Sequence, residues 1–153
     1  MTFKEDLERA KPYEKAVMKY ANHLEGVKET IDVREDKKYQ NKDIDFIVLY
    51  KDGGFKRIEI KVDFFTTQNV FLEVVSNKKY NTQGCILKSK SEEIWYVFIN
   101  LNKLYIINTK KLKNWLYTTK VELTAGGDNA LGVKIKRSDL YKHVNYRVRK
   151  IYL

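Results

Sequence analysis

The sequence predicts an α/β protein with a mixed central β-sheet flanked by helices. The chain opens with an amphipathic helical pattern, continues with several strand-like segments, and contains a second helical segment before the last of them. Helical and strand periods that alternate along one chain are typical of layered folds built on a sheet. With 153 residues, no repeats and no linker rich in Pro or Ser, residues 1–153 are expected to form one domain.

The first expected element is a helix over residues 3–24, where apolar residues recur at steps of three and four. Thr2 can cap its start, and Gly26 is a suitable stop. Pro12 leaves two alternatives open: it either kinks one long helix or occupies the first position of the main helix. Glu14 is helical in both cases. It lies on the apolar stripe of the long helix, or it is a first-turn acid favoured by the helix dipole.

Seven later segments have the alternation, or the apolar and β-branched composition, of β-strands. They span residues 27–34, 44–50, 55–63, 70–76, 93–99, 103–108 and 131–136. The remaining expectations are hairpin turns at 52–54 and 100–102, a short helix at 109–117, and a mobile loop at 126–129.

Three charged residues interrupt segments that otherwise read as buried strands. Asp45 is the second residue of one such segment, and Glu59 and Lys61 lie two residues apart on one face of the next. Charged side chains are rarely placed in such segments without a partner or a task. We therefore expect these three residues to form a site, with Asp43 as the rival to Asp45. The alternative is a pattern of charges that face solvent across two paired strands.

Two acids and a lysine on neighbouring strands suit the hydrolysis of phosphodiesters. That reaction needs a divalent metal to neutralise the scissile phosphate, a nucleophilic water, and stabilisation of the charge that develops. Mg²⁺ prefers oxygen ligands and keeps several waters, so Asp45 and Glu59 are enough to hold Mg²⁺ or Mn²⁺, and the Ile60 carbonyl can add a further ligand. The Lys61 ammonium, on the same face as Glu59, can contact the phosphate or position the water.

An Asp, a hairpin and then Glu-x-Lys resemble the PD-(D/E)xK nuclease superfamily, which includes restriction endonucleases and Holliday junction resolvases. The resemblance covers roughly residues 10–117 and is closest to small phage-encoded members, although Ile44 stands where the family has a proline. It implies a restriction endonuclease-like fold, catalytic roles for the three charged residues, and Glu14 as an additional helical acid. It also implies DNA as the substrate, including branched DNA, and a homodimer. The segments that carry it are residues 38–46, 59–63, 69–76 and 95–98.

Two further acids are candidates for supporting groups beside the metal. Glu73 lies among apolar residues on one face of its strand, which is an unusual place for an unpaired acid. Asp63 continues the face of Glu59 and Lys61, and a simple surface position is its alternative.

The chain is strongly basic, which favours a polyanionic partner. Thirty Lys and Arg against 20 Asp and Glu leave a formal net charge of +10. Residues 110–153 hold eleven Lys or Arg and three acids, so a basic C-terminal segment is expected from about residue 134. Its tyrosines either stack on unpaired bases or pack on the core. The candidate phosphate contacts are Lys134, Lys136, Arg137, Arg147, Arg149 and Lys150.

Neither a membrane span nor export is expected, because the sequence has no apolar run of spanning length and no apolar signal segment after Met1. Cys85 is the only cysteine and reads as a small buried filler. A chain with one cysteine cannot form an internal disulfide, which suits a reducing cytoplasm. If the chain is phage-encoded, the expected location is the cytoplasm of a bacterial host cell. His23 and His143 read as surface residues and not as zinc ligands.

The function predicted is that of a Mg²⁺-dependent endodeoxyribonuclease, a hydrolase that can act on branched DNA as a resolvase. The alternative from another class is a non-catalytic protein on the same fold that binds nucleic acid or inhibits a host-defence complex. A basic RNA-binding protein is a third interpretation, and recognition of the 2′-hydroxyl would distinguish it.

Overall fold

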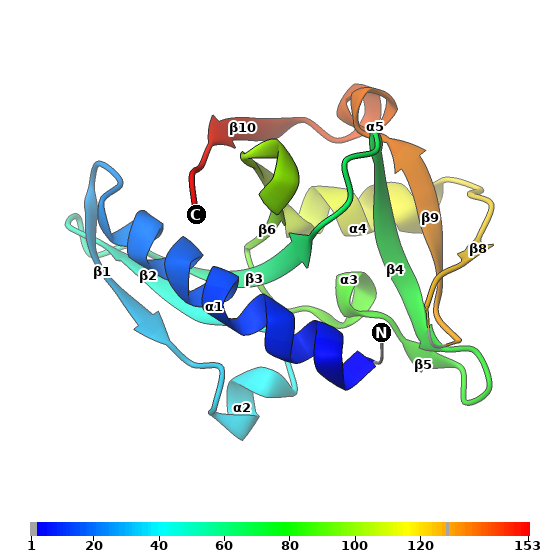
Figure 1. Cartoon of the computed structure of the whole chain (residues 1–153), viewed down its shortest axis with the longest axis horizontal. Helices are drawn as coiled ribbons and strands as arrows, with labels where there is room; N and C mark the ends of the chain where they lie inside the picture. Colours follow the sequence, from blue (N-terminus) through cyan, green and yellow to red (C-terminus); the bar gives the residue numbers. More distant parts are fainter. Residues whose placement is uncertain (1–2, 128) are drawn as a thin grey trace.

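A six-stranded mixed sheet forms the centre of the molecule (Figure 1). The computed structural model describes residues 3–127 and 129–153, so Thr2 and Asp128, within the expected cap and loop, lie outside the described residues. Neighbouring strands are antiparallel except β3 and β6, which run parallel. The predicted class, a mixed sheet with flanking helices, is confirmed. In spatial order the strands are β1 (Val27–Asp32), β2 (Phe46–Tyr50), β3 (Phe55–Asp63), β6 (Glu93–Phe98), β7 (Lys103–Asn108) and β10 (Tyr146–Lys150).

A second, antiparallel sheet of four strands lies beside the first, at the right of Figure 1. Its spatial order is β5 (Thr82–Gln83), β4 (Asn69–Asn77), β9 (Leu131–Lys136) and β8 (Thr124–Ala125). The expected strands at 70–76 and 131–136 therefore exist, but they pair with each other and not with the central sheet. Gly132 permits this pairing, because a Cβ at that position would lie 2.4 Å from the Leu72 carbonyl oxygen.

The first helix, α1 (Phe3–Asn22), runs without interruption through the exposed Pro12. The long-helix alternative is thus the one that the structure adopts. No helix among the described residues is long and apolar enough to cross a membrane. The remaining helices are α2 (Lys37–Gln40), α3 (Cys85–Lys88), the 3₁₀ turn η1 (Ile99–Leu101), α4 (Thr109–Thr118) and α5 (Arg137–His143).

Two apolar cores lie on opposite faces of the central sheet. On one face, Val17 of α1 packs with Phe46, Ile58 and Trp95, and the Phe46 and Trp95 rings meet edge to face at 5.5 Å. On the other face, apolar residues of β6 and β7 pack with β4, β9 and helices α3 to α5. Because side chains alternate along β3, the residues between Ile58, Ile60 and Val62 point toward the second sheet. This layer is where Glu59 and Lys61 lie.

The basic C-terminal segment is folded chain, since residues from 134 onward form the end of β9, then α5 and β10. Buried Ile151 follows β10, and its N–H donates to the Asn102 carbonyl at 3.0 Å. The ring of Tyr146 packs edge to face on Tyr105 with centroids 5.0 Å apart, so for this tyrosine the core-packing alternative holds. Tyr152 is exposed.

Candidate active site

Asp45 precedes β2 directly and is fixed by the backbone of β3. Its N–H donates to the Ile58 carbonyl at 2.8 Å, and the Ile60 N–H donates to its Oδ2 at 2.7 Å. The carboxyl group is therefore held beside the middle of β3. Ile60, expected to offer its carbonyl to a metal, is in contact with Asp45 through its N–H.

Glu59 is buried and forms an ion pair with Lys61. Only 5% of Glu59 is exposed, and Lys61 Nζ lies 3.0 Å from Glu59 Oε1. About one third of the Lys61 side chain is exposed, and its ammonium is the ion-pair partner of the buried Glu59 carboxylate. A strand that alternates between core and this layer places both groups on one side, as the sequence predicts.

The two carboxyl groups share a poorly solvated position. Burial, together with repulsion from Glu14, raises the pKa of Asp45 to about 6, despite the Ile60 N–H and nearby Lys61. Burial also raises the pKa of Glu59 well above its ordinary value, and the charge of Asp45 adds to this rise while Lys61 opposes it. Two acids with raised pKa values form a centre that a divalent cation would stabilise.

Lys61 stays positively charged at this centre. Burial alone would lower its pKa, but attraction to Glu59 and hydrogen bonds to Glu59 and the Cys85 thiol raise the pKa well above its ordinary value. Burial raises the pKa of the thiol to about 11, so Cys85 is a neutral neighbour of the ammonium. The sequence pattern did not indicate this contact, because α3 adjoins β3 only through the tertiary fold.

Glu14 reaches the edge of the site from α1 and is bound to Arg34. The Arg34 guanidinium lies 3.1 Å from Glu14 and 2.8 Å from Asp32, and it also donates to the Lys11 carbonyl. The helical acid expected in the site is therefore close enough to influence Asp45, yet its contact in this structure is the arginine. Arg34 follows a strand in a loop, and the sequence gives no signal for its role.

The two supporting acids have different surroundings. Glu73 of β4 accepts a hydrogen bond from the Cys85 N–H at 3.4 Å, which places it next to the residue that contacts Lys61. Asp63 accepts hydrogen bonds from the Phe65 N–H at 2.7 Å and the Tyr96 hydroxyl at 3.2 Å. Glu73 thus adjoins the site, whereas Asp63 joins β3 to β6 and to the following loop.

The donor set fits a hard divalent ion that retains water. Among the described residues, no three His, Cys, Asp or Glu side chains gather into a group able to hold a metal by themselves. Glu59 supplies a buried carboxylate and Asp45 a partly buried one, and a cation would lower the raised pKa values of both. Mg²⁺ is commonly held by one or two carboxylates together with waters and substrate phosphate oxygens. His23 and His143 are exposed, as expected.

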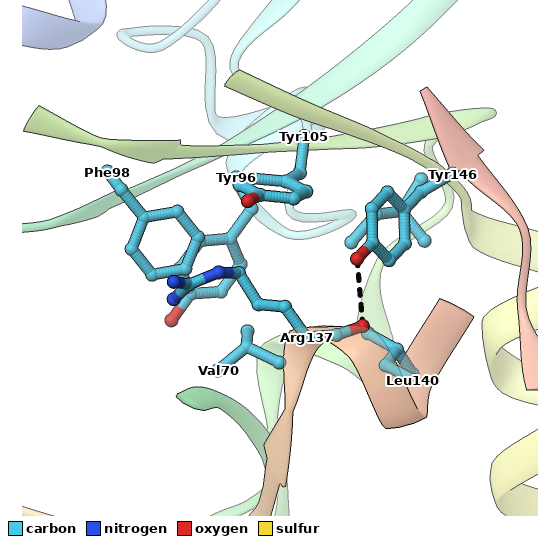
Figure 2. A pocket seen from close by; sticks show the side chains of 8 residues that line it. Val70, Tyr96, Phe98, Tyr105, Arg137, Leu140 and Tyr146 are labelled. Carbon is cyan, nitrogen blue, oxygen red and sulfur yellow. Dashed lines mark hydrogen bonds between the residues drawn. The ribbon is translucent and has the colours of Figure 1, made fainter. Parts of the chain in front are cut away.

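Arg137 is partly buried and packs against the aromatic side chains that surround it in Figure 2. Its guanidinium lies over the Phe98 ring at 4.7 Å and donates to the carbonyls of Thr67 and Asn69 at 2.6 and 3.2 Å. Figure 2 also shows its carbonyl accepting a hydrogen bond from the Tyr146 hydroxyl, at 2.8 Å. These contacts join α5 to the region between the two sheets.

The other basic candidates are divided between two places. Arg147 and Arg149 of β10 are registered with Ile106 and Leu104, which face the α1 side of the central sheet, so these arginines face away from Glu59. Arg147 is also paired with Glu93 at 2.9 Å. The others are the exposed Lys150, at the end of the same edge strand, and the exposed Lys134 and Lys136 of β9.

Comparison of the chain with models of protein families, with curated proteins and with solved structures finds no match.

The raised pKa of Asp45 predicts a pH-dependent stability when divalent ions are removed. A carboxyl group with a pKa of about 6 in the folded chain, against 3.8 ordinarily, stabilises the fold at low pH. This contribution is fully present below 3.8 and is lost as the pH rises through 6. Asp45→Asn should remove this dependence of stability on pH, because an amide does not titrate in this range. The amide oxygen can still accept a hydrogen bond from the Ile60 N–H, so the fold should be retained.

The expected size of this effect is up to about 3 kcal/mol in the free energy of unfolding between about pH 4 and about pH 7. Urea titrations of both proteins in EDTA measure it as a difference between wild type and variant. The free energy of unfolding of the variant should increase relative to that of the wild type as the pH rises. A difference that stays constant across this range would show that the Asp45 carboxyl titrates normally.

Proposed function

We propose that this protein is a divalent-metal-dependent endodeoxyribonuclease of the PD-(D/E)xK kind, with a restriction endonuclease-like fold. The observation that carries the proposal is the pair of carboxyl groups of Asp45 and Glu59, with Lys61 Nζ 3.0 Å from Glu59. A poorly solvated pair of acids with raised pKa values, beside a charged lysine, has little structural reason to exist without a cation.

Each residue has a separate task in the proposed reaction. Asp45 and Glu59 would hold Mg²⁺ or Mn²⁺, which supplies charge neutralisation and a more acidic water when bound. Lys61 stays charged beside Glu59, so it can donate to the attacking water or to a phosphate oxygen. Glu73 and the Cys85 N–H fix α3 against β4, and this contact keeps the Cys85 thiol near the lysine.

Glu14 has a supporting electrostatic task in this proposal. Its charge raises the pKa of Asp45, so it adds to the negative potential that attracts a cation. Arg34 holds Glu14 at 3.1 Å and Asp32 at 2.8 Å, which fixes the helical acid at the edge of the site.

The proposed substrate is DNA, and branched DNA is the preferred form. This choice depends on the likeness of the motif to resolvases, and it carries with it the proposal of a homodimer that cuts two strands. The excess of Lys and Arg over acids, with a net charge of +10, supports a polyanionic substrate.

Cleavage of a supercoiled plasmid, a linear duplex and a four-way junction tests this proposal, each with Mg²⁺, Mn²⁺ or EDTA. We expect metal-dependent cutting, with the junction cut fastest, and a dimer by light scattering. Faster cutting of linear duplex would exclude the resolvase version. Tight binding without cutting on any substrate would favour the non-catalytic binding protein.

A further inference from the structure

Two segments of the chain carry lysines and no acids. Residues 74–91 contain four lysines and no Asp or Glu, and so do residues 109–121. These segments lie before β6 and after β7, which are neighbouring strands of the central sheet. Their lysines are therefore expected to meet at one end of that sheet.

The fold joins these segments to a third lysine-bearing turn after α2. The Lys90 N–H donates to the Lys42 carbonyl at 2.8 Å. Lys113 of α4 donates through its Nζ to the carbonyl of Ser89, which lies between Lys88 and Lys90. We call these four residues, Lys42, Lys88, Lys90 and Lys113, the lysine platform.

A buried network of hydroxyl groups fixes the backbone under the platform. Ser89 is fully buried, and its Oγ donates to the Asp43 carbonyl at 2.9 Å and lies 2.7 Å from Ser91 Oγ. Ser91 Oγ is in turn 3.1 Å from Thr109 Oγ1 at the start of α4. Three segments distant in sequence are thus held in one arrangement, which is unlike a set of independent surface lysines.

The charges of the platform are poorly balanced by acids. Among the ion pairs of residues 3–127 and 129–153, only that of Lys88 with Asp43, at 3.8 Å, involves a platform lysine. Burial lowers the pKa of Lys113, and the charge of Lys90 lowers it further. Grouped cations that repel one another fit a polyanion that neutralises several of them together.

The platform borders the candidate active site. Asp43, which faces Lys88, is two residues before Asp45. At the other end of α3, Cys85 contacts Lys61, and Lys88 is the last residue of this four-residue helix. We propose that the lysine platform binds the phosphates of a DNA strand and leads that strand to Asp45 and Glu59.

This surface differs from the basic C-terminal segment that the sequence indicated. In that segment the Arg137 guanidinium donates to backbone carbonyls, and Arg147 is paired with Glu93 and faces the α1 side of the central sheet. The platform lies at the end of the sheet where Asp45 is held. The choice of DNA as the ligand of the lysine platform rests on the proposed function.

The test compares a variant that lacks two platform lysines with a control that lacks two exposed lysines elsewhere on the molecule. Lys88 and Lys90 are exposed. Lys19 and Lys103 are exposed as well: Lys19 belongs to α1, which covers the face of the central sheet opposite α3 and α4, and Lys103 begins β7 at its end remote from α4. The variants are Lys88→Ala with Lys90→Ala, and the control Lys19→Ala with Lys103→Ala, which has the same net charge. Fluorescence anisotropy with a labelled DNA duplex, in EDTA and over a series of salt concentrations, measures Kd for each protein.

The platform variant should bind more weakly, and the slope of log Kd against log salt should fall by about two, because each lost phosphate contact removes about 0.9 from it. The control should retain the wild-type slope. An equal loss in both variants, a larger loss in the control, or no DNA binding by the wild type would overturn the proposal. The binding test in EDTA does not depend on cleavage, so a protein that never cuts DNA could still confirm the lysine platform. A protein that cuts DNA but whose platform variant keeps the wild-type salt dependence would refute it.

Discussion

Glu59→Gln should reduce metal-dependent DNA cleavage by at least about a thousandfold, because the divalent ion supplies several kcal/mol of charge stabilisation in the transition state. Glutamine matches the shape of Glu59 and retains one amide oxygen near Lys61. Loss of charge is therefore the main change at this buried position. Single-turnover cleavage at saturating protein and Mg²⁺ measures the effect without contributions from product release.

A matched control for this variant lies four residues further along the same strand. Asp63 has a raised pKa caused by burial, but it accepts hydrogen bonds from Phe65 and Tyr96. Asp63→Asn keeps an acceptor for one of these donors and should leave the cleavage rate within a few-fold of wild type. If both variants lost activity equally, the loss would reflect a general requirement for acids in β3. It would then not support a specific role of Glu59 in binding the metal.

Lys61→Met should lower the cleavage rate by about a hundredfold or more, the usual effect of removing one preorganised donor from a polar active site. The concentration of Mg²⁺ that gives half of the maximal rate should not rise. Removal of the ammonium takes a positive charge away from Glu59 and Asp45, which favours a cation there. Rates measured across a Mg²⁺ titration separate the two effects.

Folding is the control that Lys61→Met requires. Removing one partner of a buried ion pair destabilises a protein by about 3–5 kcal/mol when the other stays charged. Thermal unfolding with and without Mg²⁺ should therefore show a less stable variant whose stability the ion restores. A rate and a metal affinity that fell by the same factor would assign Lys61 a structural role.

Local patterns on β3 were sufficient to predict the arrangement of Glu59 and Lys61. Ile58 and Ile60 face α1, and strict alternation then places the charged residues on the other face. The turn before β3 could also be predicted from its glycines, and Gly53 there has a φ of +91°, which glycine adopts without strain. These features depend on neighbours within a few residues of one another.

Features that depend on distant partners were not predictable in the same way. β4 pairs with β9, which is some sixty residues away in the sequence, and no local pattern selects that partner over the central sheet. Arg137 was expected on a nucleic-acid-binding surface because its neighbours are basic. Its position over the Phe98 ring depends on how α5 docks between the sheets.

The candidate site shows the same division. Asp45 could be identified from its place before an apolar strand, and its contact with the Ile60 N–H at 2.7 Å follows from the pairing of β2 and β3. The Arg34 partner of Glu14 and the Cys85 neighbour of Lys61 arise from loops and a short helix that pack against this unit. Sequence spacing carries no information about such contacts.

We propose that Asp45 and Glu59 form a metal-dependent nuclease site, and the first measurement to make is the conversion of supercoiled plasmid to open-circular and linear forms. Wild type should convert the plasmid with Mg²⁺ and not with EDTA. The double variant Asp45→Asn with Glu59→Gln, purified identically, should be inactive in both and thereby exclude a contaminating nuclease. Equal conversion by the two proteins, or no conversion by wild type with Mg²⁺ or Mn²⁺, would contradict the claim.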